Sequence, residues 1–204
     1  SALNAAGQYV GLLDNPGENI RLEDASGEKI LDFTYDNKWY PVTDGLGFSL
    51  VIVDENASWR TWGLNSSWRP SSRVGGSPSQ TDPPPPATPG LLITEALTHT
   101  DLPNVDTIEI YNPTASTVDL NGWYLSDDFN TPRKFRIHDR PLLLAGSYAT
   151  FDENDFNAVP SAPGSFSLSS KGDEVYLFSA DTNGNLTGYF SGFAFGAAEN
   201  GVSF

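Results

Sequence analysis

The 204-residue sequence contains no cysteine, and this absence excludes several kinds of chemistry. Without thiols the chain has no disulfide bond, no cysteine nucleophile and no cysteine-based zinc site. The sequence also lacks any run of about 18 or more apolar residues, so we expect no transmembrane helix. No stretch has the apolar spacing of an amphipathic α-helix, which leaves short β-strands as the expected structure.

Basic residues and histidine are scarce as well. The chain has 11 Lys and Arg against 26 Asp and Glu, which gives a formal net charge of −15. This charge repels phosphate backbones, so nucleic-acid binding is not expected. The two histidines, His99 and His138, lie outside any Gly-x-Ser-x-Gly or similar catalytic context. We therefore predict no catalytic residues and no enzyme.

Glycine and proline are frequent, with 19 and 15 copies, and they separate short segments in which apolar and polar residues alternate. Ile108 and Ile110 point to one face of a predicted strand, and Glu109 points to the other. Besides the alternating segment around Ile20, the predicted strands are Lys29–Tyr35, Phe48–Val53, Leu91–Leu97, Thr107–Tyr111, Val118–Leu125, Lys134–His138, Ser147–Asp152, Glu174–Ser179 and Leu186–Phe190. Short strands at this spacing predict an all-β fold of the sandwich or barrel type.

One segment of the sequence occurs twice. Leu13–Ala25 recurs as Leu168–Ala180, and Gly47–Leu50 recurs downstream as Gly201–Phe204. The turn that follows is predicted to be one residue longer in the second copy. Such a repeat indicates one structural building unit that is used twice.

A segment rich in proline and small polar residues separates the two copies. We place this linker at residues 79–90, where few side chains are able to pack and Pro83–Pro86 favours an extended, semi-rigid polyproline spacer. The predicted domains are therefore residues 1–78 and residues 91–204. Because residues 1–78 would expose unpaired strand edges, we expect their strands to pair with residues 91–204, within one chain or by exchange between chains.

Segments after the linker resemble the lamin-tail domain: Ile93–Leu97, Asp106–Pro113, Val118–Asp127 and Leu168–Leu177. The resemblance implies an immunoglobulin-like β-sandwich of mostly antiparallel short strands. Residues 91–204 are then a near-complete copy without its last strands, and residues 1–78 are the C-terminal half of another copy. We expect Trp123 to be buried between the two sheets, with Gly122 permitting the backbone bend before it.

The resemblance also implies a setting for the chain. Bacterial members of this family tend to occur in tandem within large exported or surface proteins, beside enzyme or adhesion modules. The sequence has no heptad coiled coil and no cysteine for prenylation, so a role in the nuclear lamina is not expected. We therefore predict a non-enzymatic structural or interaction module, extracellular or on the cell surface. Its expected roles are spacing, adhesion or contact with protein or polysaccharide surfaces, including contact between tandem domains.

Three tryptophans before the linker are the best candidates for ligand binding. Trp59, Trp62 and Trp68 are interleaved with arginine and asparagine, a pattern that is suited to stacking on sugar rings. The alternative is that these side chains close the open end of the sandwich. The alternative function of the chain is therefore a carbohydrate- or calcium-dependent binding module attached to a hydrolase, and burial of these tryptophans would exclude the sugar-binding role.

Calcium is the candidate ligand for the oxygen-rich segment near the end of the second copy, and no other cofactor is expected. Asp181, Asn183 and Asn185 place oxygen-bearing side chains at alternate positions, as calcium loops do. The alternative is a plain hairpin turn, because the first copy has a turn at this place.

Overall fold

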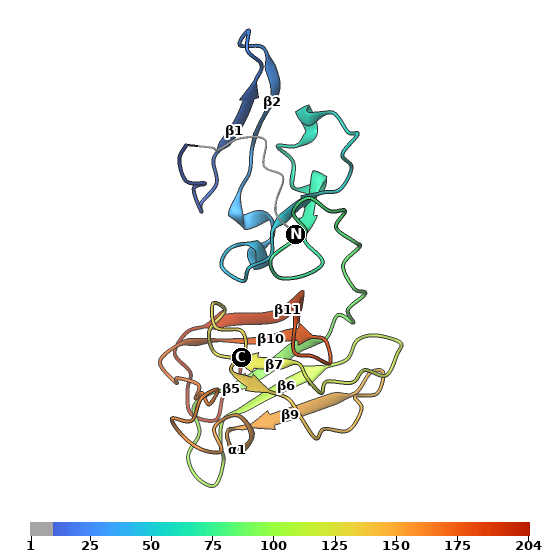
Figure 1. Ribbon diagram of the computed structural model, residues 1–204. Helices are drawn as coiled ribbons and strands as arrows, with labels where there is room; N and C mark the ends of the chain where they lie inside the picture. Colours follow the sequence, from blue (N-terminus) through green and yellow to red (C-terminus); the bar gives the residue numbers. More distant parts are fainter. Residues whose placement is uncertain (1–9) are drawn as a thin grey trace. The chain divides into compact units, whose positions relative to one another are not determined.

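The computed structural model describes residues 10–204, which form two compact units (Figure 1). One unit ends at Pro86 and the other runs from Ala87 to Phe204. All strand pairs of the described residues are antiparallel, and the predicted all-β class is confirmed. The domain limits drawn from the sequence stay a prediction, and residues 1–9 of the first predicted domain lie outside the described range.

Two sheets make up the C-terminal unit. The three-stranded sheet has the order β5-β6-β9 and the four-stranded sheet has the order β11-β10-β7-β8 (Figure 1). The strands are β5 (Leu92–Leu97), β6 (Thr107–Tyr111), β7 (Tyr124–Ser126), β8 (Phe135–Arg136), β9 (Tyr148–Asp152), β10 (Asp173–Ala180) and β11 (Leu186–Phe195), and the short helix α1 (Glu153–Phe156) follows β9.

Side chains from both sheets fill a single core between them. Ile108 and Ile110 point inward from β6, Val175 and Leu177 point inward from β10, and all four are fully buried. This alternation is the two-residue period of a strand that is buried on one face. The C-terminal unit is thus an immunoglobulin-like β-sandwich.

The last residues of the chain cover the outer edge of β5. Leu97 and Ser203 form an antiparallel bridge. The backbone N–H of Phe204 donates to the carbonyl oxygen of Ala96 at 3.0 Å, and the N–H of Ala96 donates back to Phe204 at 3.2 Å. These bonds satisfy backbone groups that an edge strand would otherwise leave unpaired.

The N-terminal unit consists of two small sheets joined by turns and short 3-10 helices (Figure 1). Its strands are β1 (Asn19–Glu23), β2 (Lys29–Thr34), β3 (Leu50–Ile52) and β4 (Trp68–Pro70), and its 3-10 helices are Asn37–Trp39, Pro41–Thr43, Trp59–Thr61 and Asn65–Ser67. β1 pairs with β2, and β3 pairs with β4. The expected pairing with residues 91–204, within one chain or by exchange between chains, stays a prediction.

The hairpins β1–β2 and β10–β11 are the two structural copies of the repeated segment. Residues 24–28 join the first pair of strands and residues 181–185 join the second, so both loops have the same length. The prediction of a longer turn in the second copy is wrong, because the additional residues lie in the strands. β10 and β11 have 8 and 10 residues, whereas β1 and β2 have 5 and 6.

Candidate functional site

The residues of the Trp123 motif build the sandwich. Trp123 is buried in the core, and Gly122 before it has a φ of 97°, in the left-handed region that favours glycine. The N–H of Gly122 donates to the carbonyl oxygen of Ile137 at 2.8 Å. At the end of β7, the hydroxyl of Ser126 donates to the carbonyl of Thr131 at 2.8 Å. The residues of this motif therefore serve packing and hydrogen bonding within the sandwich.

Asn112 is a structural residue that the sequence did not reveal. Its side chain is fully buried, and its Nδ2 donates to the carbonyl oxygens of Ser116, Leu143 and Leu144 at 2.8, 3.1 and 3.1 Å. Its Oδ1 accepts from the N–H of Thr114 at 3.0 Å. A buried amide with satisfied partners fixes the loops that it joins.

An apolar row crosses the outer face of the three-stranded sheet. Leu92 lies opposite Tyr111, which in turn lies opposite Tyr148 on the next strand. The two tyrosine rings stack with centroids 4.6 Å apart and planes 26° apart. Tyr148 is 57% exposed and Leu92 is 42% exposed. We call these three residues the tyrosine row.

Polar and acidic side chains border the tyrosine row on the same face. The next row of the sheet contains Glu95, Glu109 and Thr150. Glu109 is held in place by the hydroxyl of Thr94, which donates to its Oε1 at 2.8 Å. An exposed aromatic strip with a polar border has the composition of a surface that binds other molecules.

The outer face of the four-stranded sheet is covered by its own chain. Phe129, from the loop between β7 and β8, lies 5.3 Å from Tyr176, 5.7 Å from Phe178 and 5.0 Å from Phe190 between ring centroids. Burial and the nearby Glu174 carboxylate raise the pKa of Tyr176 to about 12. This face is therefore less available for contact than the tyrosine row.

Two of the candidate sugar-binding tryptophans pack around Phe33. The rings of Trp62 and Trp68 lie 5.6 and 5.3 Å from the Phe33 ring, and their planes are 75° apart. The indole N–H of Trp68 donates to the carbonyl of Trp62 at 2.6 Å. Trp59 lies 5.8 Å from the guanidinium of Arg60. All three indoles are half-buried and their planes do not form one platform, so carbohydrate binding stays a prediction.

The candidate calcium segment is the turn of the hairpin β10–β11. Oδ1 of Asp181 accepts from the backbone N–H groups of Asn183 and Asn185, both at 2.9 Å, and Oδ2 accepts from the Asn185 side chain at 3.0 Å. The bonds to Asn185 and the neighbouring amides lower the pKa of Asp181. The carboxylate oxygens therefore already have partners from the turn itself.

The turn of the first hairpin is built in the same way. Oδ1 of Asp24 accepts from the backbone N–H groups of Ser26 and Glu28, both at 2.9 Å. In the part of the chain that the structure describes, no group of three or more His, Asp or Glu side chains is arranged to hold a metal ion. The geometry favours a plain turn, and calcium stays a prediction.

Comparison with known families decides what the C-terminal unit is. A model of the lamin tail domain matches residues 84–189, about half of the chain. The chain belongs to the lamin-tail-domain family. No curated protein and no solved structure matches it. The match covers one copy, so the second partial copy and the bacterial tandem arrangement stay predictions.

The two histidines of the lamin-tail domain have separate local partners. Nδ1 of His99 lies 2.9 Å from the carbonyl oxygen of Ala198. Nδ1 of His138 lies 2.8 Å from the Asp139 carboxylate, and both of these side chains are exposed. Each histidine therefore contacts a loop residue, and the two contacts are separate from one another. Among the described residues, no helix is long and apolar enough to span a membrane.

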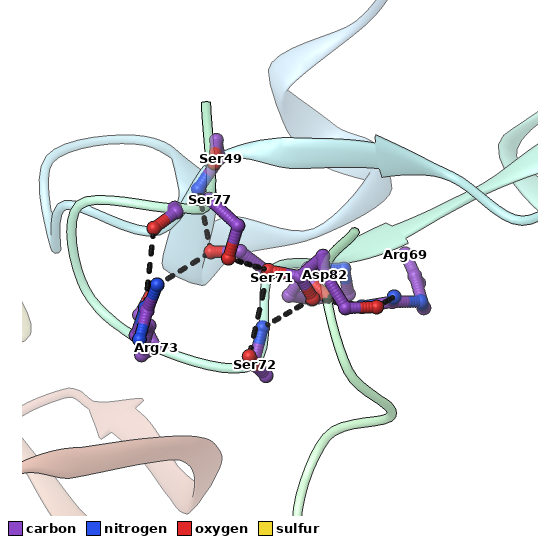
Figure 2. A network of polar contacts seen from close by, with 9 residues as sticks. Ser49, Arg69, Ser71, Ser72, Arg73, Ser77 and Asp82 are labelled. Carbon is purple, nitrogen blue, oxygen red and sulfur yellow. Dashed lines mark hydrogen bonds and ion pairs between the residues drawn. The ribbon is translucent and has the colours of Figure 1, made fainter. Parts of the chain in front are cut away.

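Asp82 connects the start of the predicted linker to the unit that precedes the lamin-tail domain (Figure 2). Its Oδ1 accepts from Nη1 of Arg69 at 2.7 Å and from the N–H of Ser72 at 2.9 Å, and its Oδ2 accepts from the hydroxyl of Ser77 at 2.8 Å. The Asp82 side chain is only 3% exposed. Asp82 is thus held by hydrogen bonds, and the expectation that few side chains of the linker are able to pack stays a prediction.

A second set of bonds lies beside Asp82 (Figure 2). The hydroxyl of the buried Ser71 donates to the carbonyl of Arg73 at 2.8 Å and accepts from the N–H of Ser49 at 3.1 Å. The N–H of Ser71 donates to the carbonyl of Ser49 at 2.8 Å. These bonds extend the β3–β4 pairing beyond Leu50 and Pro70.

Proposed function

We propose that this chain is a non-enzymatic structural and interaction segment of a large exported or surface protein of a bacterium. Its roles are spacing, adhesion or contact with other proteins. The observation that carries the proposal is the contrast within the lamin-tail domain. The Trp123 motif is used for packing, whereas the tyrosine row leaves apolar area on the outer face of a sheet.

The surface chemistry supports contact with another macromolecule. Tyrosine and leucine provide apolar area with little loss of side-chain entropy, and the hydroxyl of an exposed tyrosine forms hydrogen bonds at the border of an interface. The flat outer face of a sheet accommodates a broad partner. A small substrate is better held in a concave pocket.

Surface exposure of the native protein tests the proposed location. Intact cells are treated with a protease, and the chain is detected with an antibody against residues 87–204. We expect the chain to be degraded on intact cells while a cytoplasmic marker survives. Full protection of the chain until the cells are lysed would contradict an extracellular or surface location.

Deletion of residues 87–204 from the native gene tests the role. We expect attachment of the cells to surfaces, or association of the parent protein with the cell envelope, to decrease. Any enzymatic activity of neighbouring modules should remain, because the deleted unit supplies no catalytic group. Loss of an activity with unchanged attachment would contradict the proposal.

A further inference from the structure

Among the described strands, the hairpin β1–β2 has an open edge that its structural counterpart does not have. In the lamin-tail domain, β10 pairs with β11 on one side and with β7 on the other. In the N-terminal unit, β1 pairs with β2 on one side, and no other described strand pairs with it. An open edge presents unpaired N–H and C=O groups to another strand.

The entry to each hairpin shows that the two are equivalent. The N–H of Gly17 donates to the carbonyl of Asp14 at 3.1 Å, and the N–H of Gly172 donates to the carbonyl of Ser169 at 3.2 Å. Both glycines have a positive φ, 121° and 118°. Together with the matching Asp24 and Asp181 turns, this geometry makes β1 the counterpart of β10.

The apolar side chains of β1 are exposed where those of β10 are buried. Val175 and Leu177 on β10 are 0% exposed, because they lie in the core together with residues of the facing sheet β5-β6-β9. Their counterparts in the repeat are Ile20, which is half-buried, and Leu22, which is 49% exposed. The sequence of β1 thus retains the pattern of a core strand without the cover that β10 has.

The second repeated segment, Gly47–Leu50 and Gly201–Phe204, also differs in its pairing partners between the two units. Gly201–Phe204 pairs with β5 through Ala96 and Leu97. Its counterpart, Gly47–Leu50, continues into β3, which pairs with β4. Among the described residues, the N-terminal unit has no strand that takes the place of β5.

A cavity lies on the face where the missing strands would pack. Its volume is about 350 Å³, and its apolar lining includes Leu13, Ile20, Phe33, Phe48, Leu50 and Trp68. Ile20 and Leu50 come from the two repeated segments. Their counterparts belong to the segments that pair with β7 and β5 in the lamin-tail domain.

We propose that the N-terminal unit binds the front half of another lamin-tail domain, that is, a polypeptide with the chemistry of residues 91–167. A strand like β7 would pair along β1, a strand like β5 would pair along Gly47–Leu50, and apolar residues between them would fill the cavity. The proposal deepens the interaction role proposed above by naming a partner for the N-terminal unit. It rests on that role and adds a site distant in sequence from the tyrosine row.

The test uses the full chain as the target and a polypeptide of residues 87–167 as the probe. This probe carries β5–β9 and lacks both β10 and β11. We expect a complex of one chain with one probe, and new protection of the β1 amides in hydrogen exchange. Leu22→Asp should weaken binding by about tenfold or more, because it places a charge on an apolar contact.

The matched control is Ile30→Asp. Ile30 is 50% exposed and lies in the same hairpin, but it belongs to β2 and not to the edge strand β1, and it has no partner on β1 because the register shifts there. This variant should bind the probe as the natural chain does. Circular dichroism of both variants confirms that the hairpin unit remains folded.

Three results would overturn the proposal. One is the absence of a complex, and another is equal binding by the natural chain and Leu22→Asp, since the probe would then pair with β10 or elsewhere. The third is a dimer of the chain alone in which β1 of one copy pairs with β1 of the other, because the partner would then be a second N-terminal unit. None of these results bears on the tyrosine row, so failure here leaves the proposed interaction role to its own test.

Discussion

In each of the two units, a single buried polar side chain forms hydrogen bonds with several neighbouring residues. Burial alone would raise the pKa of Asp82, but the Arg69 guanidinium, the Ser77 hydroxyl and the Ser72 amide together hold this pKa below its ordinary value of 3.8. Asn112 has a similar role in the lamin-tail domain, where it joins two loops. Both residues are hydrophilic in the sequence, so composition alone gives no sign that they are buried.

Asp82→Asn tests the role of this carboxylate. The substitution removes the ion pair with Arg69 and leaves the guanidinium with weaker partners, so we expect the free energy of unfolding of the N-terminal unit to fall by about 1–3 kcal/mol at neutral pH. Urea unfolding followed by tryptophan fluorescence measures the effect. Glu55→Gln, at an exposed position, is the control and should change little.

The same variant tests the sign of the pH dependence. Because the pKa of Asp82 is lower in the folded chain than in the unfolded chain, its contribution to stability is complete well above 3.8 and is lost as the pH falls through and below that value. The stability difference between the natural chain and Asp82→Asn should therefore shrink on acidification from pH 7 to about pH 3. A difference that grows on acidification would contradict this account.

At the scale of elements, most strands were predictable and their partners were not. β4 was missed, and only the last two residues of the predicted strand Val118–Leu125 lie in β7. Ile108 and Ile110 alternate strongly enough to place β6 from the sequence alone. The tyrosine row was missed because Tyr148 meets Tyr111 only through the pairing of distant strands. The length of the β10–β11 turn was also wrong, because an extra residue in a strand and an extra residue in a turn look alike when two sequences are compared.

The hairpin turns provide a test that separates hydrogen bonding from calcium binding. Asp181→Ala removes the acceptor of two backbone N–H groups, and we expect it to destabilise the lamin-tail domain by about 1–2 kcal/mol. Asp24→Ala is the matched change in the other hairpin. EDTA should leave the melting temperature of the natural chain unchanged. A fall in melting temperature with EDTA that disappears in Asp181→Ala would instead support calcium at this turn.

At the scale of the whole molecule, the residues that build the sandwich differ from the residues that are exposed for contact with other molecules. The family and the fold class followed from the motif around Trp123, because that motif is local in sequence and is fixed by packing in the core. The interaction surface depends on which exposed side chains gather on one face. The tyrosine row could not be predicted from the sequence, because it depends on how three strands that are separated along the chain pair with one another.

The most direct measurement of the central claim is binding of the full chain to the isolated cell envelope of its own host, compared with Tyr148→Asp and Val159→Asp. Both substitutions place a carboxylate at an exposed apolar position, since Tyr148 is 57% exposed and Val159 is 65% exposed, but only the first changes the tyrosine row. The account predicts that Tyr148→Asp weakens binding by about tenfold, whereas Val159→Asp binds as the natural chain does. Equal binding by all three proteins, or no binding by any of them, would contradict a function that depends on this surface.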